Sequence, residues 1–354
     1  MRALVLRDYW DFAVEERPDP VPGPGEVLLK LTATGICGSD LHGYTGENGR
    51  RAPGQVMGHE TVGRVVAAGP GAPSSHLTPG QLVTVNPVIA CGECPRCLAG
   101  MEQACRVRRV IGVNAEISAA FAELMTAPAR NVVPLAESTP EEHGALVEPL
   151  AVGYHAARRG GCGPDDTVLV IGGGPIGQAC VLAARRLGAS RIAVSEPSES
   201  RRKLVASLGA TALDPTSPEL AAEVADALGG PASLVLDAVG ATGTLADAFA
   251  SSDLTARVVL VGMASPQVEL AAYRISTEER SVVGSFTYSA REFTDTAAWV
   301  GAAPDEVSRL IEARIRLEDA PSAFAELARG EITYSKILAF PGELPPGVAD
   351  TQAW

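Results

Sequence analysis

Residues 167–177 read Thr-Val-Leu-Val-Ile-Gly-Gly-Gly-Pro-Ile-Gly, a β-branched run followed at once by a glycine-rich turn. After the turn, apolar residues recur at helical spacing as far as Leu187, and Gly188 closes the segment. This order predicts a strand, a tight turn and an α-helix that begins at Pro175. The stretch is therefore typical of one strand–helix unit in a parallel sheet.

Further short β-branched runs repeat this pattern along the chain. With Thr167–Ile171, the predicted strands are Arg191–Ser195, Thr211–Leu213, Ser233–Asp237, Arg257–Val261 and Ser281–Phe286. Their starts lie 20 to 24 residues apart, which leaves room for a strand and one crossover helix. We predict an α/β protein with a doubly wound parallel sheet over residues 152–287.

The chain before this sheet has a different pattern, because Pro and Gly separate its short apolar runs. These runs are Ala3–Leu6, Glu26–Leu31, Thr61–Ala67 and Leu82–Asn86. They predict a β-rich, barrel-like domain over residues 1–151.

The chain after the sheet predicts helices over Glu306–Ala313 and Pro321–Arg329, and a strand over Lys336–Phe340. We expect residues 288–354 to complete the first domain. The alternative, a third unit, would have fewer than 70 residues for a core of its own.

Composition excludes several classes of function. The chain of 354 residues has 42 Asp and Glu against 29 Lys and Arg, a net charge of −13 that repels nucleic acids and anionic membranes. It has no apolar run of the ~18 residues that a membrane span needs. Arg2, Arg7 and Asp8 lie where a secretory segment would be apolar, so we expect a cytoplasmic protein.

The glycine-rich turn has the spacing Gly-x-Gly-x-x-Gly, and its residues are Gly172, Gly174, Pro175, Ile176 and Gly177. Such a turn, between a strand and a helix, lets the backbone approach a pyrophosphate at the helix N-terminus. Glu196 follows the next strand, where a carboxylate accepts hydrogen bonds from both ribose hydroxyls of NAD. The alternative is a tight turn without a ligand.

Four of the seven cysteines fall within fifteen residues, at Cys91, Cys94, Cys97 and Cys105. In a reducing compartment this spacing indicates a metal site rather than disulfides. Four thiolates can close a tetrahedral shell around Zn²⁺, which makes the site structural. An iron–sulfur cluster and unmetallated buried thiols are the alternatives. Cys162 and Cys180 are assigned to packing, and His76, His143 and His155 to structural roles.

A dispersed set of motifs consists of Cys37-Gly-Ser-Asp-Leu-His42, Gly58-His-Glu60 and Glu148-Pro149. Taken singly, each motif is unremarkable. With the four-cysteine segment and the glycine-rich turn, their order and spacing resemble the zinc-dependent medium-chain dehydrogenases over essentially the whole chain. Gly-His-Glu with Glu-Pro-Leu resembles most the branch of polyol (sorbitol) and threonine dehydrogenases. The resemblance implies a GroES-like catalytic domain and a Rossmann NAD-binding domain.

The resemblance also implies roles for individual residues. Cys37 and His59 would bind a catalytic zinc, and Glu60 and Glu148 compete for the remaining protein position. Asp40 would orient His59. Ser39 would take the proton of the substrate hydroxyl and pass it, through the coenzyme ribose, to His42.

On the coenzyme side, Arg201 resembles the arginine of the family that lies near the adenosine; its alternative is a solvated helix residue. Two strand ends would lie near the nicotinamide, and their residues are Val261, Gly262, Met263, Ser285 and Phe286. For Val261 and Met263 the alternative is packing in the core.

The resemblance thus implies an enzyme with two zinc ions per chain that oxidises a secondary alcohol in a polyol, sugar or cyclitol, with NAD as hydride acceptor. A threonine- or butanediol-type dehydrogenase and a catalytically silent nucleotide sensor are the alternatives. The family also implies a homodimer or homotetramer. Loop 43–57 carries Arg50 and Arg51, which we expect in a solvated loop rather than against the substrate.

Overall fold

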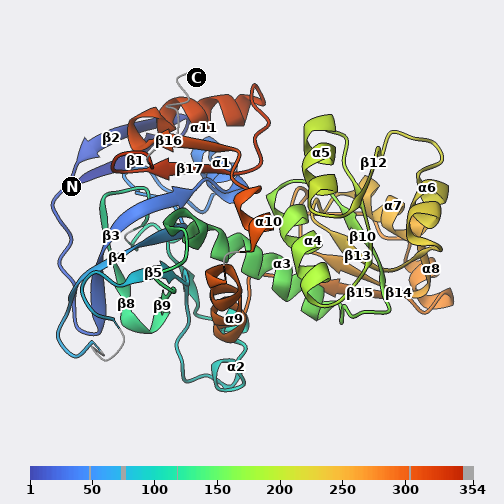
Figure 1. Ribbon diagram of the computed structural model, residues 1–354, viewed down its shortest axis with the longest axis horizontal. Helices are drawn as coiled ribbons and strands as arrows, with labels where there is room; N and C mark the ends of the chain where they lie inside the picture. Colours follow the sequence, from blue (N-terminus) through green and yellow to red (C-terminus); the bar gives the residue numbers. More distant parts are fainter. Residues whose placement is uncertain (48, 73–76, 118, 303, 346–354) are drawn as a thin grey trace. The chain divides into compact units, whose positions relative to one another are not determined.

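The computed structural model describes residues 1–47, 49–72, 77–117, 119–302 and 304–345. The chain forms two compact units (Figure 1). The first unit comprises Met1–Glu148 and Ser289–Trp354, and the second comprises Pro149–Tyr288. Helix α3 (Val147–Arg159) begins in the first unit and continues into the second.

The second unit is built on a six-stranded sheet in which every neighbouring pair is parallel. Across the sheet, the strands are β12 (Thr211–Leu213), β11 (Arg191–Ser195), β10 (Thr167–Ile171), β13 (Ala232–Asp237), β14 (Ser252–Leu260) and β15 (Ser281–Gly284). Their helices are α4 (Pro175–Arg186), α5 (Glu199–Ser207), α6 (Leu220–Leu228), α7 (Thr242–Ser251) and α8 (Ala272–Thr277). The doubly wound sheet that the strand spacing predicts is therefore present.

The strand order places β10 at the switch point of this sheet. Its neighbours β11 and β13 lie on opposite sides, and the last residue of β10, Ile171, is level with Ser195 and Asp237. In an open parallel sheet, ligands bind at the carboxyl ends of the strands on either side of such a point. The glycine-rich turn follows β10 at this place.

The first unit contains a seven-stranded sheet assembled from both ends of the chain. Its strands are β16 (Ala313–Arg316), β17 (Ile337–Phe340), β3 (Glu26–Gly35), β4 (Glu60–Ala68), β5 (Leu82–Val85), β9 (Val132–Pro134) and β8 (Leu124–Pro128), which pairs with β3. Only β16 and β17 are parallel neighbours in this sheet as described. Two small antiparallel two-stranded sheets accompany it, β1 (Arg2–Asp8) with β2 (Asp11–Glu16), and β6 (Val88–Ile89) with β7 (Arg109–Val110).

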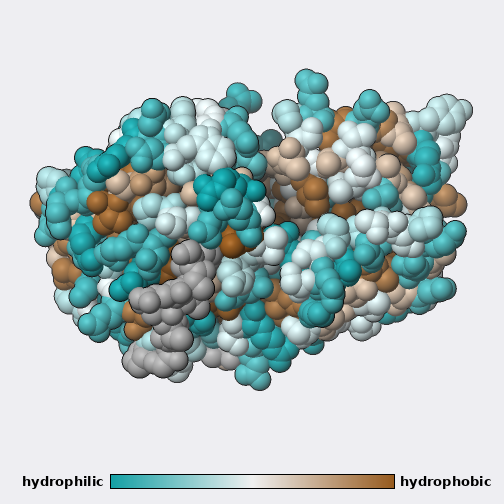
Figure 2. Space-filling view, turned by 90° about the horizontal axis from the view of Figure 1, so that it is seen from above, coloured by the Kyte–Doolittle hydropathy of each residue, from teal (hydrophilic) through white to brown (hydrophobic). Residues whose placement is uncertain are grey.

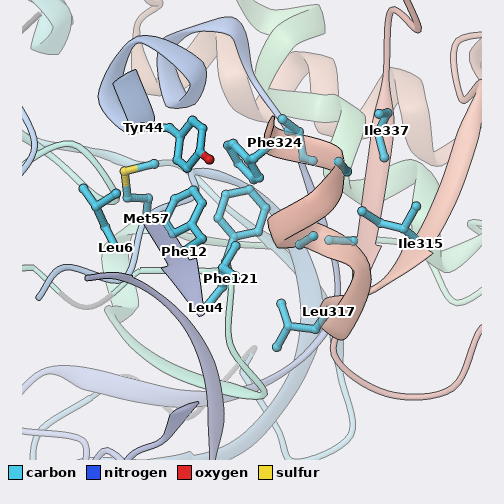
Figure 3. Close-up of a cluster of buried hydrophobic side chains, with 14 of the residues drawn as sticks. Leu4, Leu6, Phe12, Tyr44, Met57, Phe121, Ile315, Leu317, Phe324 and Ile337 are labelled. Atoms are coloured by element: carbon cyan, nitrogen blue, oxygen red, sulfur yellow. The ribbon is translucent and has the colours of Figure 1, made fainter. Parts of the chain in front are cut away.

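A cluster of aromatic side chains fixes the helices beside this sheet (Figure 3). The ring of Phe12 lies 5.0 Å from Tyr44 of α1 (Gly38–Thr45) and 4.7 Å from Phe324 of α11 (Ala320–Arg329), measured between centroids. Phe121 meets Phe324 edge to face at 5.6 Å, and Met57 is buried in the same cluster. Burial of such a cluster stabilises the segments on either side of Cys37 and His59.

One predicted helix is wrong. Residues Glu306–Ala313 form only the short helix α10 (Asp305–Ser308), and Ala313 instead begins strand β16. Ala313 and Ile315 face the core while Arg314 and Arg316 are half-buried, so the alternation of a strand prevails once β17 offers a partner. The structure also contains α9 (Ala290–Gly301), whose capping box of Ser289 and Glu292 was a visible start signal.

The surface is polar over much of the face shown in Figure 2, with hydrophobic residues between the hydrophilic ones. Among the described residues, no helix has the length and apolarity that crossing a membrane requires.

Candidate metal and coenzyme sites

The four clustered cysteines converge on one point. Sγ of Cys97 lies 3.5 Å from that of Cys94 and 3.8 Å from that of Cys91, and the Cys105 and Cys91 sulfurs are 3.7 Å apart. Zn–S bonds of about 2.3 Å in a tetrahedron place sulfurs about 3.8 Å apart. An iron–sulfur cluster spreads its cysteines over several irons, so this spacing favours a single zinc ion.

The electrostatics of these thiols also fit a dication. The backbone N–H groups of Glu93 and Cys94 donate to Cys91 and lower its pKa to about 6. Burial and the neighbouring thiols raise the pKa of Cys97 to about 12. Four sulfurs in such close contact cannot all ionise without a cation, so bound Zn²⁺ would complete the site. Helix α2 (Pro95–Leu98) begins directly after Cys94.

A second group of ligand types lies where β3 and β4 meet α1. The candidate ligand atoms of Cys37, His59 and Glu60 all lie within 4.8 Å of one another. Antiparallel pairing of Gly35 with Glu60 brings the end of β3 beside the start of β4. Gly35 is required here, because a Cβ would lie 2.2 Å from Oε2 of Glu60. A thiolate, an imidazole and a carboxylate form a donor set that suits catalytic zinc.

Asp40 supports this group from the first turn of α1. Its side chain is fully buried, its Oδ2 accepts from the Cys37 N–H at 3.3 Å, and its Oδ1 lies 3.4 Å from Nδ1 of His59. Although burial opposes charge on both groups, their mutual attraction raises the pKa of His59 well above its usual range and lowers the pKa of Asp40. The resemblance to the zinc-dependent dehydrogenases also implies that Asp40 lies beside this imidazole.

Sequence reasoning missed Lys336 as part of this site. Its side chain is buried, and Nζ donates to Oε2 of Glu60 at 2.5 Å and to the Ile36 carbonyl at 3.1 Å. Burial would lower the pKa of Lys336, but the negative charges of Glu60, Cys37 and Glu148 outweigh it and raise the pKa. The only sequence signal was a lysine at the start of a strand that is otherwise apolar.

Glu148, the other carboxylate proposed for the metal, is the second residue of α3 and is buried. Its charge acts on Lys336, so it belongs to the same neighbourhood. Among the described residues, however, the compact group of potential ligands around Cys37 contains His59 and Glu60 and not Glu148.

Ser39 and His42 lie one turn apart on α1, on the same side of the helix. Oγ of Ser39 is 3.5 Å from Sγ of Cys37. The His42 side chain is half-exposed, and its Nδ1 is 2.8 Å from Oε2 of Glu47. The pair therefore extends from the candidate metal site to the solvent.

The expectation of a solvated loop is wrong for Arg51. Arg50 is exposed, but Arg51 is only 3% exposed, and its Nη2 lies 3.4 Å from Oδ1 of Asp40. A single sequence contains no signal that distinguishes the two neighbouring arginines, because the partner Asp40 belongs to another segment.

The glycine-rich turn has the geometry of a phosphate-binding loop. Gly172 has a φ of +90°, and a Cβ on Gly177 would lie 1.8 Å from the Gly172 carbonyl oxygen, so both positions need glycine. Gly174 precedes Pro175, the first residue of α4, and Ile176 follows in the first turn. The turn therefore ends at the N-terminus of α4, and a helix N-terminus attracts an anion.

Glu196 lies at the carboxyl end of β11, beside this turn. Its Oε2 accepts from the Gly173 N–H at 2.7 Å, and its Oε1 accepts from the Ser198 N–H at 2.8 Å. The carboxylate is 3% exposed, so its position is fixed. Each carboxylate oxygen can still accept a second hydrogen bond, as it would from a ribose hydroxyl.

The two arginines near Glu196 differ in whether protein groups already occupy their hydrogen-bond donors. Arg202 donates to the carbonyls of Glu196 and Pro197 at 2.8 and 2.7 Å, and lies 3.1 Å from Asp214. Nε of Arg201 is buried without a hydrogen-bond partner among the described residues, and its guanidinium approaches Gly174. This placement favours contact between Arg201 and a coenzyme over the solvated alternative.

The residues proposed for the nicotinamide side lie at the ends of β14 and β15. Val261 is 9% exposed and Met263 is 64% exposed, so packing in the core describes Val261 but not Met263. The Val261 and Gly262 N–H groups both donate to the Asp237 carbonyl at 2.9 Å. Phe286 is 37% exposed.

Thr287, close to Ser285, is a residue that sequence reasoning missed at this edge. The hydroxyl oxygens of Ser285 and Thr287 are buried without a partner among the described residues. Thr287 also has a φ of +50°, which is strained for a β-branched residue. Strain and unpaired donors of this kind are typical of binding sites.

The residues assigned to structural roles behave as expected where they are described. Burial raises the pKa of Cys162 to about 11 and that of Cys180 to about 12, which disfavours the reactive thiolate at neutral pH. His143 and His155 are buried, and burial lowers the pKa of His143. His76 lies outside the described residues.

Comparison with known proteins places these sites in context. The family described as the alcohol dehydrogenase GroES-like domain matches residues 23–137, and the family described as zinc-binding dehydrogenase matches residues 175–302. The chain is 32% identical over 295 residues to L-galactonate-5-dehydrogenase of Escherichia coli strain K12, which covers 83% of this chain and 85% of that protein.

The chain is similar in fold to many solved structures, including two with a bound coenzyme. One, described as a zinc-binding dehydrogenase from Sinorhizobium meliloti 1021 and bound to NADP, has a TM-score of 0.89 and 31% identity, with 96% of this chain and 99% of that chain covered. The other is the alcohol dehydrogenase RspB of Escherichia coli CFT073 in complex with NADH, with a TM-score of 0.87, 28% identity and the same coverage of both chains.

Proposed function

Because this chain belongs to the zinc-binding dehydrogenases of the medium-chain alcohol dehydrogenase family and is therefore an oxidoreductase, we propose that it oxidises a secondary hydroxyl of a polyol, sugar or sugar acid to a ketone with NAD as acceptor. The observation that carries the proposal is the compact group of Cys37, His59 and Glu60, with the Ser39 hydroxyl beside Cys37. The similarity to L-galactonate-5-dehydrogenase supports a hydroxyl-rich substrate.

In this proposal, Cys37 and His59 hold a catalytic zinc together with Glu60 or Glu148. When bound, the metal would lower the pKa of the substrate hydroxyl, and the nicotinamide would accept the hydride. Ser39 would take the hydroxyl proton, and His42 would release it to solvent; the contact of Ser39 with Cys37 and the exposure of His42 support these roles. The four clustered cysteines would hold a second, structural zinc.

The choice of NAD over NADP rests on Glu196. Its buried carboxylate is fixed by the N–H groups of Gly173 and Ser198, so it would face the ribose of a bound coenzyme. A 2′-phosphate would bring like charges together there. One similar structure contains NADP and another contains NADH, so this similarity does not distinguish the two coenzymes, whereas Glu196 does.

We also propose a cytoplasmic homodimer or homotetramer. All seven cysteines lie in the described part of the chain and none forms a disulfide, which fits a reducing compartment. Strand β15 forms one edge of the six-stranded sheet, and an edge is a place where a second copy can associate. Light scattering coupled to size exclusion measures the assembly, and a monomer at micromolar concentration would contradict this part of the proposal.

The activity test follows nicotinamide absorbance with a panel of polyols, sugars, sugar acids, threonine and 2,3-butanediol, each with NAD and with NADP. We expect the highest kcat/KM for a polyol, sugar or sugar acid with NAD. Higher kcat/KM for threonine or butanediol would show the alternative substrate class. No turnover with any compound, by protein loaded with zinc, would indicate a nucleotide-binding sensor.

A further inference from the structure

Arg51 is a buried arginine that the chemistry proposed above does not use. Its side chain is almost completely enclosed, and Nη2 lies 3.4 Å from Oδ1 of Asp40. Its carbonyl oxygen accepts from the hydroxyl of Tyr9 at 3.1 Å, so the backbone at this point is also held. A buried guanidinium costs free energy unless it has partners, so its position here calls for a reason.

Asp40 connects Arg51 to the candidate metal ligands. Oδ1 of Asp40 faces both Nη2 of Arg51 and Nδ1 of His59, each at 3.4 Å. Oδ2 accepts from the N–H of Cys37 at 3.3 Å. The orientation of the Asp40 carboxylate therefore determines three contacts: with the backbone of one candidate ligand, with the ring of another, and with the guanidinium of Arg51 from the segment that follows α1.

The path of the Arg51 side chain depends on Gly43 in α1. A Cβ on Gly43 would lie 2.4 Å from Cγ and 3.3 Å from Nε of Arg51, and 3.3 Å from Sδ of Met57. Arg51 thus packs directly against the backbone of the helix that carries Asp40. Only glycine leaves space for this contact.

We propose that Arg51 is a positioning residue for the catalytic zinc: it holds the Asp40 carboxylate in the orientation in which Oδ1 faces Nδ1 of His59. This proposal rests on the zinc site proposed above. A carboxylate that fixes the ring of a ligating histidine contributes to metal affinity, and loss of such a partner typically costs 10- to 100-fold. Without Arg51, Asp40 would lose its cation and be free to turn.

The experiment measures release of zinc from the purified, zinc-loaded protein to a chromogenic chelator in excess. Wild type should lose two zinc ions in two phases. The Cys91→Ser variant, which disables the four-cysteine site, assigns one of the phases. In Arg51→Met we expect the phase of the Cys37 and His59 site to be roughly tenfold faster, with the other phase unchanged. Arg50→Met is the matched control, and its two phases should equal those of wild type.

Two further variants keep the test informative if Arg51→Met folds poorly. Arg51→Lys retains the positive charge, so zinc should leave the Cys37 and His59 site more slowly than in Arg51→Met. Gly43→Ala retains Arg51 but displaces its side chain, so it should accelerate the same phase. In Co²⁺-substituted protein, the visible d–d bands of the Cys37 and His59 site should shift in Arg51→Met and Gly43→Ala, but not in Arg50→Met.

The outcomes separate the two proposals. Wild type with zinc only in the four-cysteine site would overturn the proposed catalytic zinc site, and the role of Arg51 with it. Wild type with two zinc ions, together with unchanged release rates and cobalt bands in folded Arg51→Met, Arg51→Lys and Gly43→Ala, would overturn the role of Arg51 alone.

Discussion

Lys336 and Glu60 form a buried ion pair in which Nζ lies 2.5 Å from Oε2, with the two side chains 3% and 1% exposed. The residues are 276 positions apart in the chain, and pairing of β17 with β3 brings them together. Glu60 also belongs to the group of potential zinc ligands. The same carboxylate is therefore shared between a protein cation and the place of a metal cation.

The Lys336–Glu60 pair bears on the competition between Glu60 and Glu148. Glu148 also raises the pKa of Lys336, so one ammonium group balances two carboxylates near Cys37. A carboxylate held by Lys336 is less available to zinc than one that is not. In the zinc site proposed above, two carboxylates would therefore be available for one position on the metal, and we expect Lys336 to influence which of them is used.

The first prediction concerns Lys336→Met. Removal of one partner from a buried ion pair leaves an uncompensated charge, which costs about 3–5 kcal/mol. We expect the free energy of unfolding in urea to fall by about that amount without zinc, and by less with zinc, because Glu60 can then bind the metal.

The control is Lys203→Met. Lys203 pairs with Glu199 at 2.7 Å on the surface, where such a pair contributes less than about 1 kcal/mol. If Lys336→Met loses no more stability than this control, the buried pair is not important for the fold.

The second prediction separates the two metal sites. Cys94→Ser should remove zinc from the four-cysteine site and lower stability or assembly, because structural zinc contributes folding free energy. Cys37→Ser should remove the other zinc and leave a folded protein with little turnover. Elemental analysis should find two zinc ions per chain in wild type and one in each variant. Cys162→Ser, outside both groups, should retain two; one zinc or none in active wild type would contradict the assignment.

The third prediction concerns the proton. Ser39→Ala should reduce kcat by roughly 10²-fold at neutral pH if Ser39 takes the substrate proton. The loss should shrink at high pH, where hydroxide can take the proton directly. The measurement is a pH profile of kcat for both proteins, with Ser308→Ala, an exposed serine of α10, as control. Parallel profiles for wild type and Ser39→Ala would argue against the relay.

Local signals in the sequence were sufficient for much of the architecture. The predicted family and the α/β fold class are confirmed. The strand Thr167–Ile171 and its helix were predictable because β-branched residues, glycines and a proline act within a dozen residues. The convergence of the four cysteines was predictable for the same reason, since all four lie within one short segment.

The contacts that shape the candidate zinc site were not predictable, because they depend on how separate elements pack together and not on a local sequence pattern. Arg51 and Arg50 are neighbours in one loop, and only the position of Asp40 decides which is buried. Lys336 acquires its role from the pairing of β17 with β3. The error over Glu306–Ala313 has the same origin, because β17 also provides the partner that turns Ala313–Arg316 into a strand.

The last prediction concerns the coenzyme and tests Glu196. We expect wild type to prefer NAD, because the Glu196 carboxylate accepts from the 2′- and 3′-hydroxyls of the ribose and repels a 2′-phosphate by several kcal/mol at close range. Arg202, one candidate to neutralise a phosphate, is already held by two backbone carbonyls and by Asp214.

In Glu196→Ala the hydrogen bonds to the ribose and the repulsion of phosphate both disappear. We therefore expect kcat/KM to fall for NAD and to rise for NADP, so that the gap between them narrows. Glu199→Ala is the control, because Glu199 lies three residues further on, is exposed, and pairs with Lys203. The preference of this variant for NAD over NADP should equal that of wild type. A wild-type preference for NADP would show that Glu196 does not face the ribose, and Arg201, whose Nε is buried without a partner among the described residues, would then be the residue to test against the phosphate.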